Sequence, residues 1–207
     1  MKGKLITFEG AEGSGKSTQI QLALNYLKEH HISVVFVREP GGVKISEDIR
    51  RLLLDVENID MNDQCETLLY MAARAQLVEE QIVPALKQGK VVLCDRFLDS
   101  TIVYQGFGNK VDLKFIISVG KVVTQNIVPD LTFFFDIDAR KGLSRIKRSK
   151  DRIELRSLDY HNRVRYGYCQ LAKKDSKRIK VIDGDKSQEE IQIAVRRQID
   201  KIFRFSS

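Results

Sequence analysis

The stretch Gly10-Ala11-Glu12-Gly13-Ser14-Gly15-Lys16-Ser17 matches the pattern G-x-x-x-x-G-K-[ST] and decides the fold. An apolar run precedes it and an amphipathic stretch follows it, so the loop lies between a strand and a helix. Its glycines let backbone N–H groups turn inward around phosphate oxygens, and the helix N-terminus adds partial positive charge. The stretch predicts a site for a nucleoside triphosphate, in which Lys16 contacts the β- and γ-phosphates and Ser17 ligates Mg²⁺. The residues assigned to this site are Gly10, Ala11, Glu12, Gly13, Ser14, Gly15, Lys16, Ser17 and Thr18.

Short apolar runs alternate with longer amphipathic stretches along the chain. The runs that predict buried strands are Lys4–Glu9, Ser33–Arg38, Val91–Cys94, Leu131–Asp136 and Ile179–Ile182. The stretches that predict helices are Thr18–Glu29, 64–87 with Pro84 as a kink or late helix start, and Ser187–Phe203 with a Ser-x-x-Glu capping pattern. This alternation predicts an α/β fold of three layers, with helices on both faces of a five-stranded parallel sheet, as a single domain over residues 1–207. Ligands of such sheets bind at the carboxyl ends of the strands.

The net charge of +7 is concentrated in one segment. Residues 140–180 hold 15 of the 35 Lys/Arg and 4 of the 28 Asp/Glu, a local charge of +11 that leaves −4 on the rest of the chain. This distribution argues against a protein that binds nucleic acid over its whole surface. It calls instead for a function of the one basic segment. No apolar run reaches the roughly 18–20 residues of a membrane span, and the widely separated Cys65, Cys94 and Cys169 fit a reducing compartment. We expect a cytoplasmic protein that binds neither a membrane nor nucleic acid.

A second motif points to a different protein class. Asn109-Lys110-Val111-Asp112 matches the N-K-x-D motif with which GTPases read guanine. A functional copy should follow a buried strand, whereas Gln105-Gly106-Phe107-Gly108 precedes this one. In addition, no aspartate is followed three residues later by glycine, as the γ-phosphate switch of GTPases requires. We interpret the match as accidental, and much tighter binding of GTP than of ATP would contradict that interpretation.

Three further segments narrow the choice among phosphate-loop proteins. Arg38-Glu39-Pro40-Gly41-Gly42 follows the second predicted strand, 95–101 (Asp-Arg-Phe-Leu-Asp-Ser-Thr) follows the third, and Tyr70-Met71-Ala72-Ala73-Arg74 lies in the long predicted helix. Tyr70 and Arg74 share a helix face that can grip a flat base. Together with Tyr104-Gln105-Gly106, Pro129-Asp130-Leu131-Thr132 and Asp151-Arg152-Ile153-Glu154, the order and spacing of these segments resemble the thymidylate kinase family of bacterial type over nearly the whole chain.

The resemblance implies a reaction and its substrates. Members of this family transfer the γ-phosphate of ATP to dTMP, giving dTDP and ADP for dTTP biosynthesis, use Mg²⁺ and form homodimers. The acceptor phosphate is largely a dianion, because its second pKa is about 6, so it needs no general base. The chemical task is to bring two polyanions together and to spread the charge of a loose transition state. The implied catalytic residues are Lys16, Arg96, Asp95, Arg148 and Arg152, with Asp95 holding Mg²⁺ through water.

The resemblance also implies an acceptor site, residue by residue. Tyr70 occupies the position that stacks on thymine, Arg74 the one that hydrogen-bonds the base O4, and Thr101 the one that faces N3. Glu12 matches the acid that accepts from the sugar 3′-hydroxyl, and Tyr104 matches the ring that disfavours a ribose 2′-hydroxyl. Arg38, Arg50 and Arg96 are implied to hold the phosphate of dTMP. The residues of the full implied dTMP site are Glu12, Arg38, Arg50, Tyr70, Arg74, Arg96, Ser100, Thr101, Tyr104 and Gln105.

Part of the basic segment, residues 144–156, resembles the flexible lid of nucleoside monophosphate kinases. One subtype of the family carries a catalytic arginine in the phosphate loop, but positions 11 and 14 here are Ala and Ser, so we expect the lid to supply it. Arg148 and Arg152, with Arg145 as third choice, are expected to clamp the ATP phosphates, and closure of such a lid excludes water. The basic residues expected to be solvated surface are Lys173, Lys174, Lys177 and Arg178.

Three other hypotheses stand beside an ATP-dependent thymidylate kinase. The first is a kinase of the same fold with dGMP, CMP or AMP as acceptor, which a comparison of acceptors would identify. The second is an ATPase stimulated by nucleic acid through residues 140–180, which predicts salt-sensitive binding to DNA or RNA. The third is a regulatory GTPase, which the missing switch motif disfavours.

Overall fold

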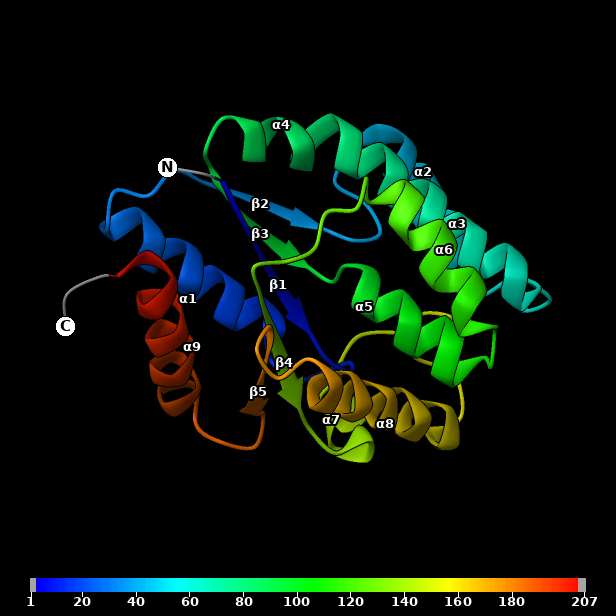
Figure 1. The fold of residues 1–207 in the computed structure, drawn as a ribbon. Helices are drawn as coiled ribbons and strands as arrows, with labels where there is room; N and C mark the ends of the chain where they lie inside the picture. Colours follow the sequence, from blue (N-terminus) through cyan, green and yellow to red (C-terminus); the bar gives the residue numbers. More distant parts are fainter. Residues whose placement is uncertain (1–2, 205–207) are drawn as a thin grey trace.

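Five parallel strands form one sheet, and the strand that leads into the phosphate loop lies at its centre (Figure 1). The computed structural model describes residues 3–204. The strand order is β2 (Val34–Arg38), β3 (Val91–Asp95), β1 (Lys4–Glu9), β4 (Leu131–Asp136) and β5 (Ile179–Asp183). All five predicted strands are confirmed, with small shifts: β2 begins one residue later than predicted, and β3 and β5 each extend to an aspartate at the carboxyl edge.

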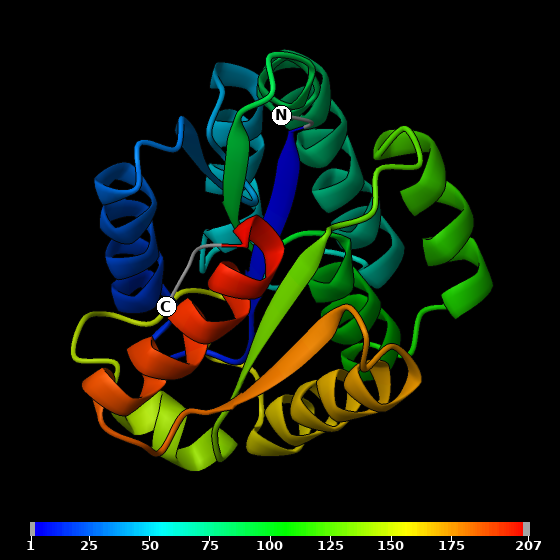
Figure 2. The same ribbon diagram turned by 60° about the vertical axis from the view of Figure 1, so that its left-hand side comes forward.

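Helices cover both faces of the sheet (Figure 2), which confirms the predicted three-layer α/β architecture. On one face lie α1 (Lys16–Glu29) and α9 (Gln188–Phe203), the latter with the predicted capping box of Ser187 and Glu190. The other helical segments lie on the opposite face or beyond the carboxyl ends of the strands: α2 (Lys44–Leu54), α3 (Asp63–Leu77), η1 (Val78–Ile82), α4 (Val83–Lys87), α5 (Leu98–Thr101), η2 (Ile102–Gly108), α6 (Leu113–Val123), α7 (Ala139–Ser144) and α8 (Leu158–Lys174). Within residues 3–204, no helix has the length and apolar character that crossing a bilayer requires.

The three central strands are buried on both faces, whereas the edge strands β2 and β5 are partly exposed, and the strands pack into separate hydrophobic clusters. Ile6 and Phe8 of β1 pack against α1 and α9, whereas Leu5 points to the other face, in a cluster with residues of η1 and α4. A third cluster, which includes Val103 and Phe134, joins η2 and α8 to the sheet. Burial on both faces explains why the three central strands read as almost continuous apolar runs. The acidic side chains of the strands are therefore concentrated at their carboxyl ends, where a ligand can reach them.

The long helix predicted over 64–87 changes its winding in the middle. α3 ends at Leu77, the five residues of η1 form a π-helical turn, and α4 begins at Val83. Pro84 lies in the first turn of α4, where its missing N–H leaves no hydrogen bond unmade. The late helix start predicted at Pro84 is therefore confirmed. The π-helical turn of η1 lies just before Pro84, where a regular α-helix would need the N–H that proline lacks.

The segment Asn109–Asp112, which matches the guanine-reading motif, does not follow a strand. It follows η2, and its side chains serve the fold: Asn109 Nδ2 donates to Glu66 Oε1 at 2.9 Å, and Asp112 accepts from the N–H of Lys114 at the start of α6. This position supports the interpretation of the match as accidental.

The loops that follow β1, β2 and β3 open at the same edge of the sheet. The register of the strands pairs Phe8 with Asp95 and Arg38 with Asp95, so these strands end at the same level. The phosphate loop, residues 39–43 and residues 96–97 are thereby placed side by side. The segment 145–148, between α7 and α8, reaches the same edge and lies across from the phosphate loop.

Candidate active site

The phosphate loop depends on glycine at two positions where the backbone is crowded. Gly10 has a φ of 144°, and a Cβ there would lie 2.6 Å from the carbonyl oxygen of Phe135. Gly13 has a φ of 68°, and a Cβ there would collide with the carbonyl oxygen of Gly142 in α7. Only glycine combines these backbone angles with so little space. The loop is thus pressed against β4 and α7, and it leads directly into the N-terminus of α1.

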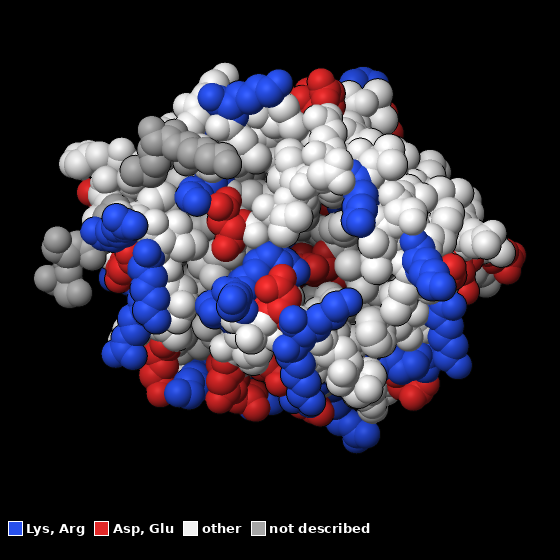
Figure 3. All heavy atoms as spheres, viewed as in Figure 1, with Lys and Arg blue, Asp and Glu red and all other residues white. Residues whose placement is uncertain are grey.

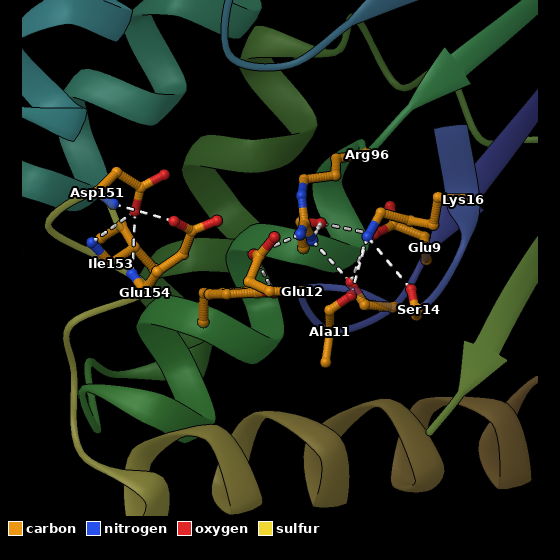
Figure 4. A network of polar contacts seen from close by, with 12 residues as sticks. Glu9, Ala11, Glu12, Ser14, Lys16, Arg96, Asp151, Ile153 and Glu154 are labelled. Carbon is orange, nitrogen blue, oxygen red and sulfur yellow. Dashed lines mark hydrogen bonds and ion pairs between the residues drawn. The ribbon is translucent and has the colours of Figure 1, made fainter. Parts of the chain in front are cut away.

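Lys16 begins α1 and folds back over the loop (Figure 4). Its ammonium donates to the carbonyl oxygens of Gly10 at 3.1 Å and of Ala11 at 3.0 Å. Burial, together with the charge of Arg96, lowers the pKa of Lys16. Neutral carbonyls are weaker partners for an ammonium than an anion is. A phosphate in front of the loop would therefore compete well for this side chain.

Glu12 and Arg96 form an ion pair where the loop after β1 meets the turn after β3 (Figure 4). Arg96 Nη2 donates to Glu12 Oε1 at 2.6 Å, and the hydroxyl of Tyr104 donates to the same oxygen at 2.9 Å. The guanidinium also lies over the ring of Tyr104, 4.9 Å from its centroid. Burial acts to raise the pKa of Glu12, but the charges of Arg96 and Lys16 outweigh it and lower the pKa to about 2. Glu12 is therefore a carboxylate at neutral pH.

A buried acid beneath this pair holds the backbone turn that carries Arg96. Arg96 has a φ of 70°, a left-handed conformation that costs a residue with a side chain about 1–3 kcal/mol. Glu9 Oε1 accepts from the N–H of Phe97 at 2.7 Å, and Oε2 accepts from the hydroxyls of Ser100 at 2.6 Å and Tyr168 at 2.8 Å. Burial raises the pKa of Glu9 to about 7. These bonds stabilise the turn in the conformation that directs Arg96 toward Glu12.

A pocket opens beside the Glu12–Arg96 pair, next to α3 and η2. All but one of the residues predicted to bind dTMP line it: Glu12, Arg50, Tyr70, Arg74, Arg96, Ser100, Thr101, Tyr104 and Gln105. The rest of its wall consists of Glu39, Pro40, Leu54, Arg148, Asp151, Ile153 and Glu154. We call this the acceptor pocket. Side chains from five separate segments converge there, and their roles toward a ligand stay predictions.

One wall of the acceptor pocket is fixed by a buried ion pair. Arg74 Nε donates to Glu39 Oε2 at 2.7 Å, and Arg74 Nη2 donates to the carbonyl oxygen of Phe97 at 3.0 Å. Both charged side chains are almost fully buried, and burial raises the pKa of Glu39 in spite of the neighbouring Arg74. Arg74 therefore lines the pocket as a rigid element, with part of its set of five N–H donors already engaged.

A second hollow, which we call the phosphate-loop cleft, runs from the Glu12–Arg96 pair across the phosphate loop. The predicted triphosphate residues that line it are Glu12, Gly13, Ser14, Gly15, Lys16, Ser17 and Thr18, whereas Gly10 and Ala11 contribute the carbonyl groups to which Lys16 is bonded. Basic side chains from several segments converge on it: Arg38, Arg50, Arg96, Arg145, Lys147 and Arg148. Arg38, predicted for dTMP, lies in this cleft and pairs with Glu47 at 2.8 Å.

Ser17 and Asp95 both line the phosphate-loop cleft, and they fit the predicted magnesium site. Asp95 Oδ1 is buried and has no hydrogen-bond partner within residues 3–204, as expected of an oxygen placed to serve a cation. No group of three His, Cys, Asp or Glu side chains in this part of the chain is arranged to hold a metal ion. One carboxylate and one hydroxyl leave most coordination positions to water and phosphate oxygens, which is the environment that Mg²⁺ prefers.

The two lid arginines expected to act together are separated in the structure. Arg148 lines both the acceptor pocket and the phosphate-loop cleft, and its guanidinium pairs with Glu154 at 2.7 Å. Arg152 does not face the cleft: its Nη2 lies 2.7 Å from Glu66 Oε2, and its Nε donates to the carbonyl oxygen of Leu53 at 2.8 Å. The charge of a buried carboxylate thus draws Arg152 away from the phosphate loop and toward α2 and α3.

Arg145, the third choice, lies closer to the phosphate loop than Arg152 does. Its Nη1 donates to the carbonyl oxygen of Gly13 at 3.2 Å, and its side chain lines the phosphate-loop cleft with Lys147. The predicted lid arginines that line the phosphate-loop cleft are therefore Arg145 and Arg148.

Acids within the segment and from distant parts of the fold compensate much of the charge of residues 140–180. Arg178 pairs with Asp99 at 2.6 Å and with Asp175 at 2.8 Å, and Arg165 pairs with Asp136 at 2.7 Å. The prediction that Arg178 is solvated surface is wrong, because its side chain is only 15% exposed and is ion-paired to a residue 79 positions away. On the face of the molecule in Figure 3, basic and acidic side chains are interspersed. The local charge of +11 thus gives little support to a nucleic-acid-binding surface.

Three buried carboxylates that organise the site were absent from the predicted set. Glu9, Glu39 and Glu66 are 0%, 5% and 0% exposed. Glu9 ends β1 and Glu39 follows β2, so their positions at strand ends offer a usable signal. Glu66 offers no such signal, since its partners Gln105 and Arg152 are far along the chain.

Comparison with known proteins agrees with this geometry. The sequence profile described as "Thymidylate kinase" matches residues 8–195. A thymidylate kinase of Symbiobacterium thermophilum is 46% identical over 198 residues, which cover 95% of this chain and 92% of that protein. One of Halothermothrix orenii is 48% identical over 196 residues, with 92% of this chain and 93% of that protein covered.

A solved structure gives the same result for the fold. The crystal structure of thymidylate kinase from Ehrlichia chaffeensis matches 96% of this chain and 100% of that chain, with a TM-score of 0.81 at 34% sequence identity. Since the profile, the relatives and the solved structure all cover most of the chain, this protein belongs to the thymidylate kinase family.

Proposed function

We propose that this chain performs the reaction for which its family is named, the transfer of the γ-phosphoryl group of ATP to dTMP, giving dTDP and ADP for dTTP biosynthesis. One observation carries the proposal: the phosphate-loop cleft and the acceptor pocket meet at the Glu12–Arg96 ion pair, and both residues line both spaces. Direct transfer between two nucleotides requires that their phosphates approach each other in a fixed orientation. The shared wall provides such a meeting point.

On the donor side, the loop backbone and Lys16 bind the triphosphate, and Arg145 and Arg148 add positive charge from across the phosphate-loop cleft. Arg96 lies at the junction and is placed to neutralise charge on both nucleotides. This arrangement suits a loose transition state, in which negative charge spreads over the oxygens of the transferred group.

On the acceptor side, Tyr70 and Arg74 hold the base, and Glu12 accepts a hydrogen bond from the sugar 3′-hydroxyl. Because the pKa of Glu12 is lowered to about 2, this acceptor stays charged throughout the neutral pH range. The hydroxyl of Tyr104 donates a hydrogen bond to Glu12, which fixes the position of the ring. The fixed ring leaves no room for a ribose 2′-hydroxyl. Arg50 and Arg96, which line both spaces, hold the acceptor phosphate.

An acceptor comparison tests the proposed function directly. ADP release from ATP is measured with dTMP, dUMP, dGMP, dCMP and AMP, and with the ribose counterpart of dTMP. We expect the largest kcat/KM for dTMP, and a lower value for the ribose counterpart because of Tyr104. Negligible turnover of dTMP beside rapid turnover of another monophosphate would assign a different acceptor to this fold.

Replacement of Lys16 or Arg96 by alanine should slow the transfer by about two to four orders of magnitude, because each removes positive charge that stabilises the transition state. Initial rates at saturating ATP and dTMP, together with thermal unfolding, provide the measurement. The matched controls are Lys44→Ala and Arg51→Ala, whose side chains are 93% and 75% exposed. Near-normal rates of Lys16→Ala or Arg96→Ala would refute the assigned role.

We also propose that Ser17 and Asp95 hold Mg²⁺, which when bound neutralises phosphate charge. The buried, unpartnered Oδ1 of Asp95 supports this assignment. Chelation by EDTA should stop the transfer, and added Mg²⁺ should restore it. Asp95→Asn should raise the Mg²⁺ concentration needed for half-maximal rate, whereas an unchanged concentration would mean that Asp95 does not serve the metal.

A homodimer is proposed as the assembled form. Exposed apolar side chains on the neighbouring helices α3 and α6 support it, since Leu68, Leu113 and Ile117 are 48%, 37% and 38% exposed. Sedimentation velocity should give about twice the chain mass of 23.7 kDa, and Ile117→Glu should shift the protein toward the monomer. A monomer at micromolar concentration would contradict the proposal.

The cytoplasm is the proposed location of the protein. All three cysteines, Cys65, Cys94 and Cys169, are free thiols in the structure, as in a reducing compartment. Cell fractionation with an antibody against the chain tests this location.

A further inference from the structure

Glu66 is a buried carboxylate that receives hydrogen bonds from two different parts of the chain. Its Oε1 accepts from Gln105 Nε2 and from Asn109 Nδ2, each at 2.9 Å. Its Oε2 accepts from Arg156 Nη2 at 3.1 Å and forms an ion pair with Arg152, whose Nη2 lies 2.7 Å away. Glu66 lies in the first turn of α3, one helical turn before Tyr70, and its side chain is 0% exposed. The acid thus joins α3 to the end of η2 and to the basic segment.

The carboxylate fixes which end of the Gln105 amide points toward it. A carboxylate only accepts hydrogen bonds, so Gln105 must present its NH₂ group to Glu66 and direct its carbonyl oxygen elsewhere. An ordinary amide leaves this choice open, because its two ends have nearly the same shape. Here the carboxylate of Glu66 determines the orientation of the Gln105 amide. Within residues 3–204, the structure gives the side-chain oxygen of Gln105 no donor, and Gln105 lines the acceptor pocket.

The charge of Glu66 is itself held in place independently of any ligand. Arg152 donates from Nε to the carbonyl oxygen of Leu53, and the guanidinium of Arg156 lies over the ring of Tyr160, 5.4 Å from its centroid. Both arginines are therefore anchored at a second point. Two guanidinium groups therefore compensate the charge of one buried carboxylate.

We propose that Glu66 is a positioning residue for acceptor selection: it turns Gln105 so that the amide oxygen, beside Thr101, faces N3 of the base and accepts a hydrogen bond from the ring N–H. The proposal rests on the proposed function, in which this pocket holds the base of the acceptor nucleotide. Thymine and uracil carry an N–H at N3, whereas cytosine has a lone pair there. An oxygen that faces a lone pair in a buried site is repelled and unpaired, so the pocket discriminates against dCMP.

The test is the ratio of kcat/KM for dTMP to that for dCMP in the Glu66→Gln enzyme. A glutamine at this position has both a donor and an acceptor end, so it no longer dictates the orientation of Gln105. We expect the ratio to fall by about ten- to a hundred-fold, chiefly through a higher KM for dTMP, with little change in the KM for ATP. Thermal unfolding and far-UV circular dichroism establish that the variant is folded.

A double-mutant comparison separates positioning from a general loss of structure. In a Gln105→Ala background, Glu66→Gln should leave the dTMP to dCMP ratio unchanged, because the group on which Glu66 acts is gone. Asp63→Asn is the matched control: it makes the same chemical change in the first turn of α3, near Arg156, without contact to Gln105. It should keep the wild-type ratio.

Should Glu66→Gln fail to fold, Glu66→Asp is tested in its place. The aspartate keeps the negative charge that both arginines need, but its shorter side chain moves the carboxylate away from Gln105. A fall of the ratio in this variant supports the proposal. An unchanged ratio in a folded variant, or equal losses with dTMP and dCMP, overturns it. A wild-type enzyme that is inactive on dTMP would instead refute the proposed function, so the two failures are distinguishable.

Discussion

The ion pair between Glu12 and Arg96 is the contact on which the rest of the site depends. It joins the loop after β1 to the turn after β3, two strands that are neighbours in the sheet. Arg96 reaches it only because its backbone is left-handed, and the bonds that Glu9 makes just beyond Arg96 oppose the cost of that conformation. The pair is partly exposed, with 16% of Arg96 and 22% of Glu12 accessible, so a ligand can contact both groups without breaking it. A guanidinium with five N–H donors can hold a carboxylate and a phosphate at once.

Charge compensation across the fold gives the basic segment its shape. Several of the acids that pair with its arginines come from other elements: Glu66 from α3, Asp99 from α5 and Asp136 from β4. Pairing is uneven along residues 144–156, since the side chain of Arg148 is 64% exposed and that of Arg152 only 4%. The segment is therefore tied to α2 and α3 near its C-terminal end, while its N-terminal end presents arginine to the phosphate loop. The number of charges along the chain does not predict this arrangement, because it does not say which arginines and acids form ion pairs.

The sequence was sufficient to predict the strands, the main helices and many residues of the site, and each success has a physical reason. Parallel strands are buried on both faces, so runs such as Leu131–Asp136 stand out, and the order of strands and helices then places the loop ends at one edge. Residues at those ends, such as Arg96 and Tyr104, were found because they follow a strand directly or belong to a recognisable segment. Arg152 and Arg178 were misplaced because each pairs with an acid far away in sequence, and hydrophobic periodicity carries no information about such pairs.

Glu66 shows a further limit, since the property at issue is the direction of a hydrogen bond and not the position of a residue. The sequence contains Gln105 in a recognisable segment, but an amide can donate or accept from either orientation. The direction is set by an acid 39 residues away, whose charge is in turn compensated by two arginines of the basic segment. The contacts of Glu66 with Gln105 and Arg152 are buried, so water screens them little, and the orientation that Glu66 imposes on Gln105 reaches the wall of the acceptor pocket. Selection of a base edge can thus depend on a residue that never touches the base.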